Sequence, residues 1–527
     1  MTASAGSAPG ASPAGPRPSG PVVPPTWIAA LLLLSVYVVV KHAFGILICD
    51  DAYITLSHAR SWNQGLGPIM SQWNPVCATS TPLHTLLLAI EGLLSRGRAY
   101  PAMAYWNNAV WDLVGFFYFY RIARGGLGLT GPWPLLALAA YALSVNALAV
   151  SASGMETPMY VALALAGSWY AFYAHRPLPL LAVISLLAPL TRPEGMLLPM
   201  VILCARRLRM TGFDRTARIA AAAACVGLAL FFAFNLYAYG RPLPHSILAK
   251  RMEIHVGFVE GLQAWVLNVF YKGPCFGGAR ITTLANGLIV AGAVAGFLRG
   301  RNRNGSRSAP GGDAGIPWRL LAWPAVYFLF FTATRSSYAI FTWYFLPVLP
   351  FLILFLASGL ERMLRGVLPA TLHWGLFFGF LALVPAQTFR QKLPQKHAFQ
   401  EAAREGRYRL AARMVDSLAV PGRTPLVMTD EVGAIGYWSH ARILDTHGLL
   451  SPEALPYLGP AEGYFLRLQA MQDKFDPEWI MGLRLAKDEG LLYPGEDGVY
   501  AGYLPARIMR LPPHPYNMEI WHRVAPD

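Results

Sequence analysis

The sequence Cys49-Asp-Asp-Ala-Tyr-Ile-Thr-Leu56 stands at the end of the first long apolar run of this chain, which extends from Trp27 to Ile48. A carboxylate without a partner is costly inside hydrocarbon, so Asp50 and Asp51 are expected at the aqueous end of a membrane-spanning helix. Two interpretations of this acid pair are open. The aspartates either end a helix at the membrane surface and do nothing more, or they supply a general base to chemistry on a substrate held in lipid.

The composition indicates a polytopic membrane protein. Of the 527 residues, 55% are hydrophobic and 13% are charged, whereas soluble domains carry about 25% charged residues. The net charge of +15 does not indicate a nucleic-acid partner, because the arginines cluster in short loops between apolar runs, the pattern of cytoplasmic loops. Residues 1–25 are rich in Ala, Gly, Ser and Pro, so we expect a disordered cytoplasmic tail and not a cleavable signal peptide.

The basic loops predict the topology. Apolar runs continue to residue 386, and a full span needs about 20 residues. If residues 82–94 form a short juxtamembrane helix instead of a span, every basic loop falls on the cytoplasmic side. The prediction for 26–386 is therefore an α-helical membrane domain of about eleven spans, with a cytoplasmic N-terminus and a first external loop at 48–103. The basic loops that decide this contain Arg121 and Arg124, His175 and Arg176, residues 206–218, residues 299–307, and Arg362 and Arg365.

Two further features complete the predicted organisation. The apolar runs 178–190 and 194–205 are short for full spans, which predicts a broken hairpin that meets at Thr191–Gly195. From residue 387 to residue 527 the charge rises and long apolar runs stop. This part is predicted to be a small external α/β domain, with strands at 425–429, 442–445 and 477–481 and a helix after the turn at Asp430.

Six short motifs occur in a fixed order along the chain: Asp50–Arg60, Asn63–Gly67, Thr79–Leu86, Ser153–Pro158, Thr191–Gly195 and Pro244–Lys250. With these motifs the chain resembles the GT-C glycosyltransferases that use polyprenyl-phosphate sugars, and within them the mycobacterial-type arabinofuranosyltransferases and related bacterial membrane enzymes. The resemblance covers roughly 45–450. The sequence departs from the family pattern at His58, where relatives mostly have arginine, and at Gln72-Trp-Asn-Pro-Val76, which replaces an acidic-glycine-tyrosine stretch.

The resemblance implies an activity and a location. It implies transfer of an arabinose-like pentose or a hexose from a polyprenyl-phosphate donor to a cell-envelope glycan or glycolipid. The reaction would take place on the periplasmic face of the bacterial cytoplasmic (inner) membrane, with the external α/β domain in the periplasm. Such a transfer needs a base for the acceptor hydroxyl and cations for the leaving phosphate. The family pattern favours Asp50 as the base in an inverting displacement, with Asp51 orienting a side chain or helping to bind a divalent cation.

Six other residues are candidates for substrate binding. Lys250 and Arg251 would bind the donor phosphate, or they are ordinary interfacial cations. Arg192 and Glu194 would line the site, or they form an internal ion pair that closes the hairpin. Glu156 is a second acid of the site or a residue that favours the first turn of the next helix. The sixth candidate, His84, lines the site or anchors the chain at the interface.

A transporter or flippase of a lipid-linked sugar is the alternative function. Transporters commonly contain internal repeats and helices broken near the middle of the bilayer. We find no repeat in the order of the loops, and the acid pair lies at a helix end. Nucleotide-binding and zinc-protease motifs do not occur in the sequence. Cys49 and Cys77 flank one loop and would form a disulfide if that loop faces an oxidising compartment.

Overall fold

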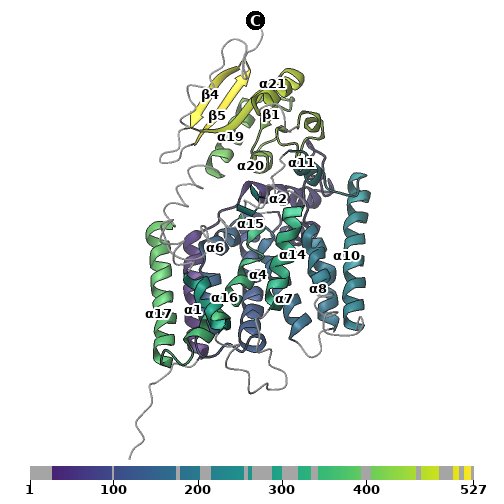
Figure 1. Ribbon diagram of the computed structural model, residues 1–527. Coiled ribbons are helices and arrows are strands. Elements are labelled where there is room, and N and C mark those ends of the chain that lie inside the picture. Colours follow the sequence, from purple (N-terminus) through teal and green to yellow (C-terminus); the bar gives the residue numbers. More distant parts are fainter. Residues whose placement is uncertain are drawn as a thin grey trace, which may run out of the picture.

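The chain folds into a bundle of long helices with a smaller α/β unit stacked on one end (Figure 1). The computed structural model describes residues 26–97, 100–173, 178–201, 215–253, 259–260, 262–263, 288–298, 318–333, 342–392, 405–458, 464–485, 503–509 and 516–523. The predicted tail at 1–25 lies outside these residues, and so do three of the five basic loops, wholly or in large part.

The bundle is organised around α7, which is buried along almost its whole length and on every side. A helix that is apolar all round must lie inside a bundle, and α7 has that composition. At the periphery, α10 and α17 expose large apolar side chains, as helices that face lipid do. The described helices of the bundle include α1 (Thr26–Phe44), α4 (Tyr100–Arg121), α5 (Trp133–Ala142), α6 (Val145–Ala152), α7 (Thr157–Phe172), α8 (Leu178–Thr191), α10 (Arg215–Tyr239), α14 (Trp318–Ala333), α16 (Leu349–Leu364) and α17 (Ala370–Gln387).

The described part of the chain contains fewer helices that qualify as spans by length and composition than the eleven predicted for the whole chain. Among the described residues three helices are long and apolar enough to cross a membrane, at Thr26–Phe44, Arg218–Tyr239 and Ala370–Arg390. A fourth span results if α5 and α6, which are bent by 53° at their junction, count as one. Helix α6 begins as a separate element because Ser144 caps it by accepting a hydrogen bond from the Ala147 amide at 3.2 Å. Eleven spans therefore remain a prediction.

The predicted break between residues 191 and 195 is present. Helix α8 ends at Thr191, and a 3-10 turn, η2 (Pro193–Met196), follows. Gly195 packs so closely on α8 that a Cβ added to it would lie 2.0 Å from the carbonyl oxygen of Ala188. Only glycine allows this close approach of two backbone segments.

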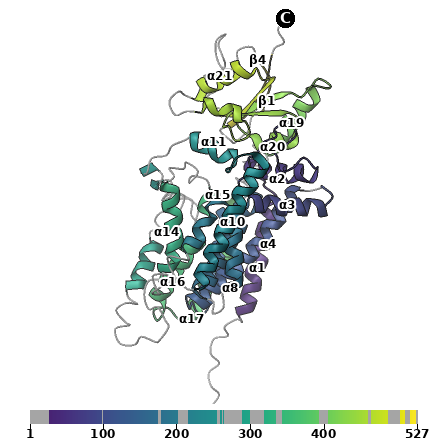
Figure 2. The ribbon, with the colours of Figure 1, turned by 90° about the vertical axis from the view of Figure 1, so that its right-hand side faces the viewer.

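Helices α2 (Asp50–Asn63) and α3 (Pro82–Leu94) lie between the bundle and the α/β unit (Figure 2). The segment before α2 runs beside the end of α6, since the Cys49 amide donates to the Ser153 carbonyl at 3.0 Å. In α3, Leu86, Ile90 and Leu93 form an exposed apolar stripe, as in a helix that lies at a membrane surface. That stripe supports the predicted juxtamembrane position of 82–94. Cys49 and Cys77 are both buried free thiols, so the disulfide considered from the sequence is not formed.

The α/β unit contains a five-stranded mixed sheet in the order β2-β1-β3-β5-β4. Strands β1 (Leu426–Thr429), β2 (Arg442–Asp445) and β3 (Trp479–Leu485) are parallel, and β4 (Tyr503–Met509) and β5 (Tyr516–Arg523) pair antiparallel with each other and, through β5, with β3. The sequence predicted β1 and β2, and it predicted a strand at 477–481 that begins two residues before β3 does. It missed β4, in which Pro505 precedes a register shift, and β5. The helical elements are α19 (Glu405–Leu418), α20 (Val432–Trp438), η6 (Pro452–Tyr457) and α21 (Tyr464–Phe475).

Candidate active site between the bundle and the α/β unit

The side chain of Asp50 binds the first turn of α20. Its Oδ2 accepts the Gly433 amide at 2.8 Å, and its Oδ1 accepts the Ala434 amide at 2.7 Å. The first amides of a helix have no partner within the helix, and α20 has no capping hydrogen bond from its own N-cap side chain. A carboxylate is the preferred partner at this end, because the helix dipole places partial positive charge there. Both oxygens of Asp50 therefore serve the contact between the two parts of the molecule.

Asp51 is left available on the same helical turn. Its side chain is half-buried, and within the described ranges it forms no hydrogen bond or ion pair. It lies close enough to Glu156 to act on that carboxyl electrostatically. Burial raises the pKa of Glu156, and the charges of Glu194 and Asp51 add to this effect, whereas Arg192 opposes it. Asp51 thus faces a cluster of charged side chains at the N-terminal end of α7.

That cluster centres on Arg192, which is itself buried. The guanidinium lies 3.0 Å from Glu156 Oε1 and 2.6 Å from Glu194 Oε1, and it donates to Thr157 Oγ1 at 3.2 Å. It also lies over the ring of Tyr344, 4.7 Å from the centroid. One guanidinium is therefore shared by two carboxyl groups. These contacts favour the internal ion pair over the alternative that Arg192 lines the substrate site, because a donor phosphate here would meet two carboxylates.

Lys250 lies on α11 (His245–Glu253), which the structure places against the first loop. The His245 amide donates to the Cys77 carbonyl at 3.2 Å, and a Cβ added to Gly448 of the α/β unit would lie 3.7 Å from the Cβ of Ala249. The side chain of Lys250 is half-buried, and that of Arg251 lies outside the described part of the structure. Helix α11 therefore reaches the region where bundle and α/β unit meet, and the phosphate-binding role of Lys250 and Arg251 stays a prediction.

His84 is buried on the inner face of α3, with 1% of its surface exposed. Neither ring nitrogen has a hydrogen-bond partner among the described residues. Burial lowers the pKa of His84 to about 4, so the imidazole is neutral at pH 7. This setting does not fit an interfacial anchor or a cation for phosphate.

The departures from the family pattern lie at packed contacts. His58 is fully buried, with Nδ1 2.7 Å from the Ile54 carbonyl, and its Nε2 accepts the Ala78 amide at 3.2 Å. In the stretch 72–76, Asn74 exchanges two hydrogen bonds with the Ile443 backbone of β2, at 2.8 and 2.9 Å. These contacts hold the first loop to α2 and to the sheet.

A buried polar cluster beneath the first loop was not included among the sequence candidates. Asp112 of α4 accepts the Tyr37 hydroxyl at 2.6 Å and the Ser151 hydroxyl, and Lys41 Nζ lies 3.7 Å away. Lys41 also donates to the Ser151 side chain. The cluster fixes the end of α6, and with it the loop that leads to Glu156. An acid within an apolar span and a lysine in the preceding one were the available sequence signal.

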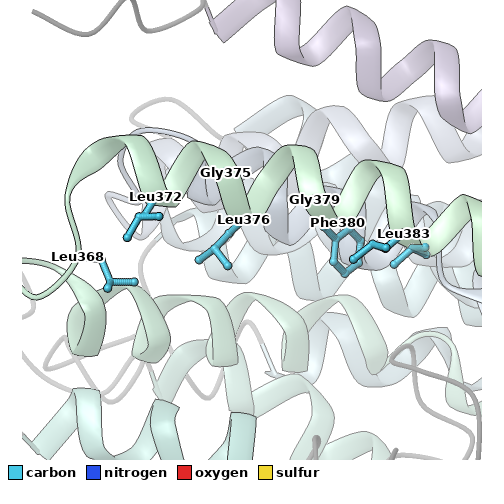
Figure 3. A pocket seen from close by; sticks show the side chains of 8 residues that line it. Leu368, Leu372, Gly375, Leu376, Gly379, Phe380 and Leu383 are labelled. Carbon is cyan, nitrogen blue, oxygen red and sulfur yellow. The ribbon is translucent and has the colours of Figure 1, made fainter.

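Two further searches of the described residues bear on ligands. No group of three His, Cys, Asp or Glu side chains is placed to hold a metal ion in the described part of the chain. An apolar groove of about 410 Å³ runs along α17 (Figure 3). It is lined by Leu368, Leu372, Gly375, Leu376, Gly379, Phe380, Leu383 and Val384, so it offers no polar group for chemistry.

Two solved structures resemble this one over almost their whole length. They are ArnT from Cupriavidus metallidurans in the apo state, with a TM-score of 0.56, and the same protein bound to undecaprenyl phosphate, with a TM-score of 0.54. The chain has the GT-C fold. In both comparisons the identity is 13%, and 95% of this chain matches 99% and 98% of the ArnT chains, respectively. At this identity the likeness concerns the fold, and the closer relation to arabinofuranosyltransferases stays a prediction.

The α/β unit has a family model of its own. Residues 398–521 match the family described as Domain of unknown function (DUF8728). No curated protein matches the sequence. The matched region contains α20, so the contact of Asp50 joins this domain to the GT-C bundle.

Proposed function

We propose that this protein is a membrane glycosyltransferase that takes a sugar from a polyprenyl-phosphate donor. The observation that carries the proposal is an available carboxylate, Asp51, on a helix at the end of a GT-C bundle. One structural neighbour with this fold was solved with undecaprenyl phosphate bound. The acceptor is a hydroxyl of a cell-envelope glycan or glycolipid, and the reaction takes place on the periplasmic face of the cytoplasmic membrane.

Asp51 is the general base in this proposal, in place of the Asp50 that the family pattern favours. Proton uptake by Asp50 on either oxygen would weaken a hydrogen bond to α20. Asp51 has no such bond among the described residues, so it can accept the proton of the acceptor hydroxyl as that oxygen attacks the anomeric carbon. A single carboxylate that acts opposite the departing phosphate gives inversion at the anomeric carbon, by analogy with inverting glycosidases.

The other predicted residues divide into two groups. Lys250 and Arg251 stabilise the negative charge on the departing phosphate, because α11 extends from the first loop toward the α/β unit. Glu156, Arg192 and Glu194 hold the loops around Asp51 by their mutual ion pairs. No step requires a nucleotide, since the donor phosphate ester supplies the leaving group.

The test is the Asp51→Asn variant of the full chain, expressed in a strain from which the gene has been deleted. The readout is mass spectrometry of the surface glycans. The same variant is purified and assayed for release of polyprenyl phosphate from synthetic polyprenyl-phospho-arabinofuranose and polyprenyl-phospho-hexoses, with envelope extract of the deletion strain as acceptor. Losing a general base typically lowers the rate by about 10²- to 10⁴-fold, and donor binding should change little. Near-normal transfer by Asp51→Asn moves the role away from Asp51, and near-normal transfer by the double asparagine variant of Asp50 and Asp51 ends the proposal.

The same assay separates the transporter alternative. A flippase would move the lipid-linked sugar across liposome membranes without forming polyprenyl phosphate or a glycosylated product. An unmodified donor that changes leaflet in the presence of the wild-type protein would favour that class over the transferase.

A further inference from the structure

We propose that α20 of the α/β unit is a positioning element of the active site, which sets the place of Asp51 through its contact with Asp50. The proposal rests on the proposed function, and it makes Asp50 a positioning residue and not the base. It also gives the DUF8728 region a role in catalysis although the base lies outside it.

The first support is the closeness of the contact. Besides the two hydrogen bonds to the carboxylate, the backbone of α20 touches the backbone of α2. A Cβ added to Gly433 would lie 1.9 Å from the Asp50 carbonyl oxygen and 3.1 Å from Oδ2. Any other residue at 433 must therefore push the two helices apart, because the atom it meets belongs to the backbone.

The second support is that α2 is tied to α20 at both ends. Near the end of α2, Arg60 donates to the Tyr437 carbonyl at 2.8 Å, and its guanidinium lies 4.1 Å from the centroid of the Tyr437 ring. The acid thus meets the first turn of α20 and the arginine meets its last turn. Each charge is opposite to the partial charge of the helix end it contacts. This pairing fixes the direction of α20 along α2, and Figures 1 and 2 both show the two helices side by side.

The consequence for chemistry follows from the chain itself. Asp50 and Asp51 are consecutive residues in the first turn of α2, so a shift of the backbone at one moves the other. Reacting atoms must approach to about 3–3.5 Å, and a misplacement of about 1 Å can lower the rate by about 10²-fold. The contact with α20 therefore controls the rate even though α20 need not touch the substrate.

The test uses two glycine-to-alanine changes in α20 of the full-length protein. Gly433→Ala meets the backbone of Asp50. Gly436→Ala instead meets two side chains: the terminal methyl of Met70, at 2.8 Å, which can move aside, and Ile443 Cγ1, at 3.4 Å, an ordinary van der Waals distance. Both changes raise helix propensity equally, so they form a matched pair. We expect Gly433→Ala to lower kcat by about 10-fold or more with the KM for the polyprenyl-phospho-sugar within about 2-fold, and Gly436→Ala to stay within about 2-fold in both.

A double-mutant cycle distinguishes positioning from direct chemistry. If Asp50 acts only through α20, the kcat of the double variant Asp50→Asn with Gly433→Ala should be no lower than that of the slower single variant. The reason is that both changes disrupt the same contact between Asp50 and α20. Effects that multiply, or a large loss in Asp50→Asn with normal kcat in Gly433→Ala, would overturn the proposal.

Hydrogen exchange gives a readout that does not need catalysis. In the wild-type chain the amides of Gly433 and Ala434 should exchange slowly, and Asp50→Asn should speed their exchange while peptides of α21 are unchanged. Unchanged exchange at 433 and 434 contradicts the contact itself. Faster exchange in a protein that shows no sugar transfer would instead contradict the proposed function and leave the contact standing.

Discussion

Replacement of Arg192 by methionine removes the positive charge that lies between Glu156 and Glu194. Methionine keeps most of the apolar volume but leaves two buried carboxylates facing each other without the guanidinium. Breaking a buried ion pair by removal of one partner costs about 3–5 kcal/mol, because the remaining charge stays buried and unpaired. Here two carboxylates lose their partner at once, so we expect a loss at or above the upper end of that range, partly relieved by proton uptake.

The assay is thermal unfolding in detergent, followed by tryptophan fluorescence, together with the KM for the donor. Arg192→Met should unfold at a clearly lower temperature than the wild type. The triple variant that also carries Glu156→Gln and Glu194→Gln should recover most of the loss, since replacing all members of a buried ion cluster is often close to neutral. An Arg192→Met protein with wild-type stability and a raised donor KM would refute this reasoning and assign the guanidinium to the donor phosphate.

Three further outcomes are expected. Asp112→Ala should destabilise the protein by about 3–5 kcal/mol in the same assay, because it breaks a buried ionic cluster. As a control, Asp473→Ala at an exposed position should change the stability by less than about 0.5 kcal/mol. Equal effects of the two changes would contradict a structural role for the cluster. The pKa of His84 is about 4 in the folded state and 6.5 in the unfolded state, so between these pH values only the unfolded chain takes up the proton. The contribution of this group to the free energy of unfolding, up to about 3 kcal/mol, is therefore present above pH 6.5 and is lost as the pH falls toward 4. His84→Leu should flatten the pH dependence of the unfolding temperature in that window, and an unchanged slope would argue against a buried neutral imidazole. A topology reporter fused after Arg124 should be cytoplasmic, and one fused at Asp527 should be external. A cytoplasmic reporter at Asp527 would place the α/β unit on the side of the membrane opposite to the proposed reaction.

Local features of the fold could be predicted because local residues determine them. A carboxylate pair stops an apolar run, and the sequence accordingly predicted that the first span ends before Asp50; α1 ends at Phe44 and α2 begins at Asp50. The break after Thr191 was predicted from Thr-Arg-Pro-Glu-Gly195, whose proline and glycine end one helix and permit the close turn. The break between α5 and α6 was missed, because the apolar run continues through it and Ser144 alone marks the new helix. Strand β4 was missed for a related reason, since Pro505 argues against a strand in a single sequence.

The site was harder to predict than the fold because its contacts are distant in sequence. Asp50 and Gly433 are 383 residues apart, and no spacing rule connects them. The sequence could bring Arg192 and Glu194 together, since they are two residues apart, but not Glu156, which shares the same guanidinium. His84 was a candidate on residue type alone, and only its burial shows that it is not a cation at neutral pH. Residue type was enough to identify the acids as candidates. Only the long-range packing distinguishes Asp50, which contacts α20, from Asp51, which lies near Glu156.

The two adjacent aspartates can have different roles because they stand on a helix. Consecutive residues of an α-helix point about 100° apart, so two neighbouring side chains cannot face the same surface. Asp50 faces α20 and is held there by two amides, while Asp51 faces the bundle, near Glu156. A strand would direct the two side chains to opposite faces, and a flexible loop would fix neither. Helix α2 therefore allows one carboxylate to hold the α/β unit in place while its neighbour, rigidly linked to it, faces the charged cluster around Arg192.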